Sequence, residues 1–131
     1  MSKRKILLID DERDLCKMVK VNLERTGEFE VTTANSGEEG LARVKEIKYD
    51  LVITDYNMPG MNGREVLDTI KKMKPRPPVI LFSIYHDDTS AIDDSIKGEA
   101  DAVIAKPFEH KELHERIIEV LSRKENQSRS S

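Results

Sequence analysis

The sequence contains a single cysteine, Cys16, and no tryptophan. One cysteine excludes an internal disulfide and a zinc site made of several thiolates, and this scarcity is typical of proteins in a reducing cytosol. We expect Cys16 to be an inert, packed thiol. Long apolar runs are also missing, because no clean run, such as those at 6–9 and 79–82, exceeds four residues, whereas a membrane-spanning helix needs about 20. We therefore expect a cytoplasmic protein with no membrane partner.

The chain has no excess of positive charge, since 22 lysines and arginines stand against 25 aspartates and glutamates, for a net charge of −3. A protein that holds nucleic acid through its phosphates needs a basic surface, so we expect no nucleic-acid binding by this domain. The length of 131 residues suits one domain of about 100–150 residues. We assign that domain to residues 1–124, and we predict that the polar segment 125–131 is a disordered tail.

Five short apolar segments alternate with longer segments of helical periodicity. The apolar segments are residues 6–9, 29–33, 51–54, 79–82 and 102–105. Three of them are apolar throughout, as strands covered on both faces are, whereas 29–33 alternates, as an edge strand does. The pattern predicts an α/β protein with a (βα)5, flavodoxin-like, doubly wound parallel sheet of strand order 2-1-3-4-5. The fourth helix, expected at about 87–97, has only three apolar residues on one face.

Polar and charged residues follow four of the five predicted strands. Asp10 and Asp11 follow the first, Asp55 the third, Ser83 the fourth and Lys106 the fifth. Because the carboxyl ends of parallel strands share one edge of the sheet, we expect these side chains to meet there. Three carboxylates at close range repel one another unless a cation lies among them. Mg²⁺ prefers such oxygen ligands and also binds phosphate, so the sequence predicts a magnesium site suited to phosphoryl transfer.

In this interpretation Asp55 is the nucleophile, because a carboxylate beside a metal can accept a phosphoryl group as an acyl phosphate. Asp10 and Asp11 hold the metal. The Lys106 ammonium and the Ser83 hydroxyl stabilise the charge that spreads over the phosphoryl oxygens.

Simpler interpretations apply to several of these residues when each is taken alone. An aspartate after a strand, such as Asp11, is more often the N-cap of the next helix than a metal ligand. His110 and His114 are four residues apart and could share a metal, but a solvated polar helix face is the favoured interpretation for them, and His86 is treated in the same way. The coincidence of polar groups at four strand ends is what favours a functional site.

The residues at these strand ends resemble the receiver domain of bacterial two-component response regulators. The resemblance rests on IDDE at 9–12, TDYNMPGMNG at 54–63, Ser83 and KPF at 106–108, and it covers roughly residues 4–123. It implies that a sensor histidine kinase or a phosphotransfer protein phosphorylates Asp55. A downstream protein would then read the change through the fourth helix, the fifth strand and the fifth helix.

The resemblance also implies a ligand set for Mg²⁺: Asp11, Asp55 and the main-chain carbonyl of Asn57, with Asp10 acting through a metal-bound water. It implies a cis peptide bond between Lys106 and Pro107. Such a domain is not an enzyme with an external substrate, because its only reactions are Mg²⁺-dependent self-phosphorylation and self-dephosphorylation at Asp55.

Two positions depart from the family pattern: Val103 stands where an aromatic residue is usual, and Ile84 stands where a small residue is usual. They leave open a degenerate receiver that acts only as a protein-interaction module. A phosphatase of the haloacid-dehalogenase type is a further alternative, but it needs an acid at position 57, where this chain has Asn57. A nucleotide or flavin carrier of the same fold is disfavoured, because the sequence has neither G-x-G-x-x-G nor a Walker motif.

Overall fold

The computed structural model of the chain describes residues 3–84 and 99–130. Its elements, in chain order, are β1 (Arg4–Ile9), α1 (Arg13–Glu24), β2 (Phe29–Ala34), α2 (Gly37–Glu46), β3 (Leu51–Asp55), α3 (Gly63–Lys71), β4 (Val79–Ile84), β5 (Ala102–Lys106) and α5 (His110–Ser130). Each expected strand is present, one to two residues longer than its apolar segment. The fourth helix expected at 87–97 lies outside the described residues.

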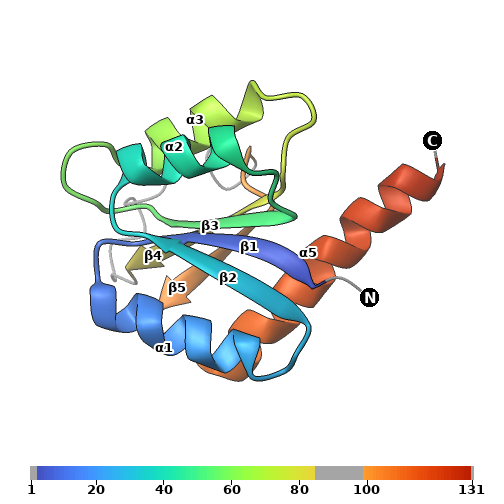
Figure 1. Cartoon of the computed structure of the whole chain (residues 1–131), viewed down its shortest axis with the longest axis horizontal. Helices are drawn as coiled ribbons and strands as arrows, with labels where there is room; N and C mark the ends of the chain where they lie inside the picture. Colours follow the sequence, from blue (N-terminus) through green and yellow to red (C-terminus); the bar gives the residue numbers. More distant parts are fainter. Residues whose placement is uncertain (1–2, 85–98, 131) are drawn as a thin grey trace.

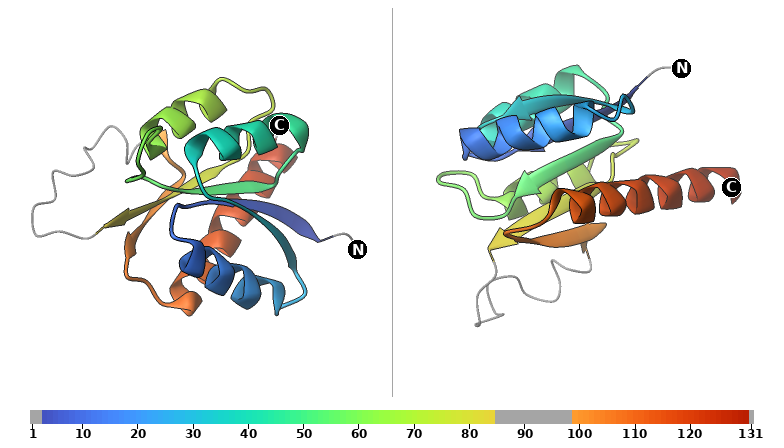
Figure 2. Two further views of the ribbon diagram at one scale, coloured as in Figure 1. Left: turned by 60° about the vertical axis from the view of Figure 1, so that its left-hand side comes forward. Right: turned by 90° about the horizontal axis from the view of Figure 1, so that it is seen from below.

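The five strands form one parallel sheet in the order β2-β1-β3-β4-β5, as the sequence predicts. Figure 1 shows α2 and α3 on one face of this sheet and α1 and α5 on the other. The left-hand view in Figure 2 shows the same two helical layers. β2, the strand with the alternating pattern, is at an edge, and the central strands have a helical layer on each face.

The side chains of β1 alternate between the two faces of the sheet, so this one strand packs against both helical layers. Ile6 and Leu8 pack in the cluster that contains residues of α1 and α5, whereas Leu7 and Ile9 pack in the cluster under α2 and α3. Successive side chains of a strand point to opposite faces of the sheet. A strand buried on both faces must therefore be apolar at every position, and all four of these residues are fully buried.

Side chains cap the two helices on the α2 and α3 face. The Ser36 hydroxyl accepts a hydrogen bond from the Glu39 N–H of α2, and the Asn62 side chain accepts one from the Glu65 N–H of α3, each at 3.1 Å. Such caps satisfy N–H groups that have no partner inside the helix. They fix where each helix begins, directly after the loops that follow β2 and β3.

α5 continues as a helix to Ser130, through residues that are expected from the sequence to form a disordered tail. Leu113, Ile117, Val120 and Leu121 anchor the first part of α5 in the core. Once a helix is anchored, each further residue adds a hydrogen bond, and residues 111–130 contain no glycine or proline to stop it. Within the described part of the chain, no helix combines the length and the apolar character needed to span a membrane.

Candidate functional site

Three carboxylates meet at the carboxyl edge of the sheet. Asp10 directly follows β1, Asp11 is the next residue, and Asp55 ends β3. One oxygen from each lies within 4.8 Å of the others, and among the described residues this is the only cluster of histidines, cysteines and acids that could hold a metal. The register pairs Ile9 with Thr54, so Asp10 and Asp55 leave neighbouring strands at the same level.

The three carboxylates differ in their exposure to solvent. Asp10 and Asp55 are fully buried, whereas Asp11 is exposed. A metal at this cluster would therefore lie beside two carboxylates from the protein interior and one at the opening. The Oδ1 atom of Asp55 is buried without a hydrogen-bond partner. An unpartnered buried carboxylate oxygen is costly in free energy, and a cation ligated at this position would satisfy it.

Lys106, at the end of β5, reaches this cluster from the other side. Its Nζ lies 2.7 Å from Asp10 Oδ2, 3.5 Å from Asp55 Oδ2 and 3.5 Å from Glu12 Oε1. The lysine side chain is 12% exposed, so solvent screens these interactions weakly. The peptide bond between Lys106 and Pro107 is cis, as the family resemblance implies.

Burial controls the protonation of this site. Burial, followed by the negative charge of Asp10, raises the pKa of Asp55 to about 6, although Lys106 opposes the shift. Burial likewise raises the pKa of Asp10. Burial lowers the pKa of Lys106, but its hydrogen bond and attraction to Asp10 outweigh burial, so the pKa lies above its usual value. The single positive charge of Lys106 does not neutralise all the carboxylates around it. A divalent cation would neutralise the remaining negative charge.

Hydrogen bonds hold the turn after β1 in place. Asp10 Oδ1 accepts from the Glu12 N–H at 2.9 Å, and the main-chain carbonyl of Asp10 accepts from Asn35 Nδ2 at 3.1 Å and from Cys16 Sγ at 3.4 Å. The N-cap of α1 is Glu12, not Asp11, and no side chain caps this helix. Asp11 is therefore not used as a helix cap, which removes the simpler interpretation of that residue.

A glycine keeps the backbone after β3 close to α3. A Cβ added at Gly63 would lie 2.6 Å from the Asp55 carbonyl oxygen and 2.6 Å from Tyr56 Cα. The Gly63 N–H also donates to the Tyr56 carbonyl oxygen at 2.9 Å. The loop that contains Asn57 is thereby closed directly beside Asp55, and Asn57 itself is exposed in this loop.

The structure places Ser83 at the same edge. Asp55 pairs with Phe82 in the register of β3 and β4, so Ser83 is one residue farther toward the carboxyl end. Ser83 is half-buried and pairs with Ala105, the residue before Lys106. The strand ends thus bring together the polar groups that the sequence predicts to share one cleft.

The other residues considered from the sequence lie elsewhere. His110 Nε2 is 3.4 Å from Asn22 Nδ2 of α1, and His114 Nε2 is 3.4 Å from Glu28 Oε1. His86 is outside the described residues. Cys16 is buried, as expected, and burial raises the pKa of its thiol to about 12.

Sequence reasoning did not identify Asn35, whose side chain supports the Asp10 carbonyl. Asn35 directly follows β2. β2 ends one residue later than the expected strand at 29–33, so the apolar Ala34, and not Asn35, stood at the predicted strand end.

Comparison with known proteins supports the family resemblance found in the sequence. The family model of the response regulator receiver domain matches residues 6–118. The alkaline phosphatase synthesis transcriptional regulatory protein PhoP of Bacillus subtilis is 32% identical over 128 residues, which are 98% of this chain and 52% of that protein. The cell cycle response regulator CtrA of Brucella abortus is 32% identical over 129 residues, 96% of this chain and 53% of that protein. The chain therefore spans about half the length of these curated relatives.

Solved structures match nearly the whole chain. A response regulator receiver domain protein from Clostridium thermocellum is 36% identical with a TM-score of 0.83, over 95% of this chain and 98% of that one. The response regulator TrrA from Thermotoga maritima, solved in complex with Mg²⁺ and BeF, is 36% identical with a TM-score of 0.78, over 89% of this chain and 98% of that one.

Proposed function

The chain belongs to the family of response regulator receiver domains and is a phospho-accepting signalling domain, and on this basis we propose that Asp55 is its phosphoacceptor. The observation that carries this assignment is the position of the Asp55 carboxylate, buried between the other two acids and the Lys106 ammonium. A carboxylate held in this way can attack phosphorus without losing side-chain freedom at the moment of reaction.

In the proposed reaction an Asp55 oxygen attacks the phosphorus atom of a phosphohistidine. The phosphorus–nitrogen bond breaks, an acyl phosphate forms, and the imidazole that leaves takes up a proton. Lys106 Nζ is already within 3.5 Å of Asp55 Oδ2, so it can follow the negative charge onto the new phosphoryl oxygens. The Ser83 hydroxyl is placed to donate a hydrogen bond to one of them.

Mg²⁺ is the proposed cofactor. Asp10, Asp11, Asp55 and the carbonyl of Asn57 would hold it, with Asp10 acting through a water. The fit is supported by the oxygen-only donor set, the exposed Asp11 and the partnerless Asp55 Oδ1. When bound, Mg²⁺ supplies positive charge that offsets repulsion between the carboxylates and the phosphoryl group.

Receiver domains of response regulators interact with histidine kinases and downstream effectors. We propose that a sensor histidine kinase or a histidine phosphotransfer protein supplies the phosphoryl group to this chain in the cytoplasm. The proposed output face comprises the segment 87–97, β5 and α5, and it contacts a protein rather than nucleic acid. The support for a protein target is the net charge of −3, which gives no general attraction to phosphates.

The proposed chemistry is confined to Asp55 and does not turn over an external substrate. The rival interpretation, an interaction module without phosphorylation, draws on Val103. This residue is half-buried and packs against the core under α2 and α3, so an aromatic side chain that turns inward is missing at this position. The proximity of Asp10, Asp11, Asp55 and Lys106 favours phosphorylation over that rival.

Incubation with acetyl phosphate and Mg²⁺, followed by intact-protein mass spectrometry, tests the proposal. We expect the mass to rise by one phosphoryl group, which is lost in base but not in acid, and we expect EDTA to prevent the gain. Asp55→Asn should abolish the increase, whereas the matched variant Asp14→Asn, in the first turn of α1, should retain it. No increase in the wild-type protein would support the interaction module instead.

A further inference from the structure

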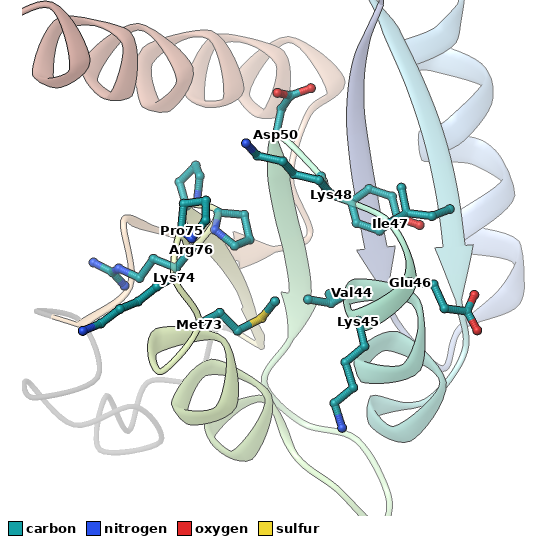
Figure 3. A pocket seen from close by; sticks show the side chains of 13 residues that line it. Val44, Lys45, Glu46, Ile47, Lys48, Asp50, Met73, Lys74, Pro75 and Arg76 are labelled. Atoms are coloured by element: carbon teal, nitrogen blue, oxygen red, sulfur yellow. The ribbon is translucent and has the colours of Figure 1, made fainter.

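A hollow of about 540 Å³ opens at the end of the sheet opposite the acidic cluster. Its walls are two chain segments, 44–50 before β3 and 73–78 before β4. Figure 3 shows Val44 and Met73 pointing toward each other across the hollow, while Lys45 and Lys74 point away from it. The amino ends of two central strands thus carry a surface that the phosphorylation site does not use.

The wall surfaces are apolar and partly rigid. Val44 is buried, Met73 is half-buried, and Ile47 at the end of α2 is 40% exposed. The opposite wall contains Pro75 and the pair at 77–78. Proline fixes one backbone angle and has no N–H to donate. This wall therefore loses little conformational freedom when something binds against it, which favours binding.

The charge around the hollow is opposite to that of the whole chain. Four positive charges in its lining come from Lys45, Lys48, Lys74 and Arg76, against two negative charges from Glu46 and Asp50. Asp50 already accepts a hydrogen bond from the Lys5 backbone N–H at 2.8 Å. The lining thus carries a net charge of +2 in a protein whose net charge is −3, so it would attract an acidic partner.

One cation of the lining has an unmet hydrogen bond. The Nη1 atom of Arg76 is buried and has no hydrogen-bond partner, and the hydroxyl of Tyr49 in the same lining is also buried and unpartnered. A buried donor without an acceptor is costly in free energy. Arg76 as a whole is half-exposed, and a carboxylate that reaches its guanidinium would pair with it in the geometry that arginine favours.

From these features we propose that the hollow docks an acidic, amphipathic polypeptide segment of a partner protein. An apolar side chain of that segment enters between Val44 and Met73. Acids that flank it bind Arg76, Lys45 and Lys74 at the outer rim of the hollow, where Figure 3 shows these side chains pointing away from its centre. A polypeptide is favoured over a small anion because the three lysines are exposed and long, whereas small-ligand sites rely on a few polar groups held in fixed positions. This docking does not require phosphorylation of Asp55.

Selection from a displayed library of random dodecapeptides tests the proposal. Peptides are enriched on the full wild-type chain and depleted on Arg76→Glu, at a half-exposed position that belongs to neither core cluster. We expect the enriched peptides to be net acidic with at least one large apolar residue. Failure to enrich any peptide, or enrichment of basic or uncharged ones, overturns the proposal.

A fluorescein-labelled synthetic copy of an enriched peptide is then titrated and followed by fluorescence anisotropy. We expect Arg76→Glu to weaken binding by about fivefold or more, and Lys74→Glu to weaken it in the same direction. The matched Arg116→Glu, on α5 across the sheet, should change affinity by less than about twofold. Equal weakening by both arginine variants would overturn the proposal.

Amide chemical shifts locate the peptide on the protein and separate the remaining outcomes. We expect changes confined to residues 44–50 and 73–78, and the same changes in Asp55→Asn, so the result does not depend on whether Asp55 is the phosphoacceptor. Changes elsewhere overturn the proposal. Full displacement of the peptide by free glutamate or inorganic phosphate would show a small-anion site and would also overturn it.

Discussion

The Nζ atom of Lys106 lies 2.7 Å from Asp10 Oδ2, closer than the 3.5 Å that separates it from Asp55 Oδ2. The ammonium of β5 therefore pairs first with the acid of β1, three strands away in the sheet. Lys106 thereby neutralises most of the negative charge of Asp10 and less of the negative charge of Asp55. A phosphoryl group or a metal at Asp55 enters a site whose lysine is already close and needs to move only a short distance.

Lys106→Gln should lower stability strongly. The substitution leaves the fully buried Asp10 without its cation, and removal of one partner from a buried ion pair costs about 3–5 kcal/mol. Urea denaturation at neutral pH without metal measures the change. The matched variant Lys111→Gln, at an exposed position of α5, should stay within about 0.5 kcal/mol of the wild type. Similar losses for both variants would show that the contact with Asp10 contributes little.

The stability of the metal-free protein should fall as the pH rises through the range from 4 to 6. The pKa of Asp55 is raised to about 6 by burial and then by Asp10, from 3.8 for an unperturbed carboxyl. Between these values the folded state binds a proton that the unfolded state has released, so stability decreases with increasing pH. Thermal unfolding in EDTA across this range measures the effect.

Asp55→Asn removes that titration and serves as its comparison. We expect the variant to be more stable than the wild type at pH 7 by about 1–3 kcal/mol. The difference should shrink as the pH falls from 6 toward 4. A difference that stays constant over this range would mean that the Asp55 carboxyl is not perturbed by burial.

Addition of Mg²⁺ should raise the midpoint of thermal unfolding of the wild-type protein, because a ligand that binds only the folded state stabilises that state. At a ligand concentration of a hundred times Kd, the free energy of unfolding rises by about 2.7 kcal/mol. Asp11→Asn should lose most of this gain, since it removes the exposed carboxylate of the cluster. Asp14→Asn, a nearby change of the same charge in α1, should retain it. An equal response of the two variants would place the metal away from Asp11.

Cys16 should resist thiol reagents in the native protein. The residue is 2% exposed, and burial, together with the negative charge of Asp10, raises the pKa of its thiol to about 12. Only the thiolate reacts, so labelling with iodoacetamide at pH 8 should be slow until denaturant is added. Rapid labelling without denaturant would show that α1 opens readily from the β1 turn.

The alternation of apolar segments was sufficient to predict the sheet order, because the exposure of each strand depends on its place in the sheet. The all-apolar segment of β1 is central and the alternating β2 is at an edge. The same reasoning placed Asp10, Asp11 and Asp55 together. It did not predict the contacts of Asn35 and Cys16 with the Asp10 carbonyl. These contacts depend on how α1 and the loop after β2 pack against the end of β1.

By itself, the sequence determined the order of strands and helices, the two-faced core and the edge at which the acids gather, because strand periodicity and apolar burial are properties of short segments. Only the tertiary structure decided that Lys106 contacts Asp10 more closely than Asp55 and that the buried Nη1 of Arg76 has no partner beside an apolar hollow. The partners of a long side chain such as Lys106 or Arg76 come from strands and loops that are distant in the sequence. Which of them it contacts depends on distances that exist only in the folded chain.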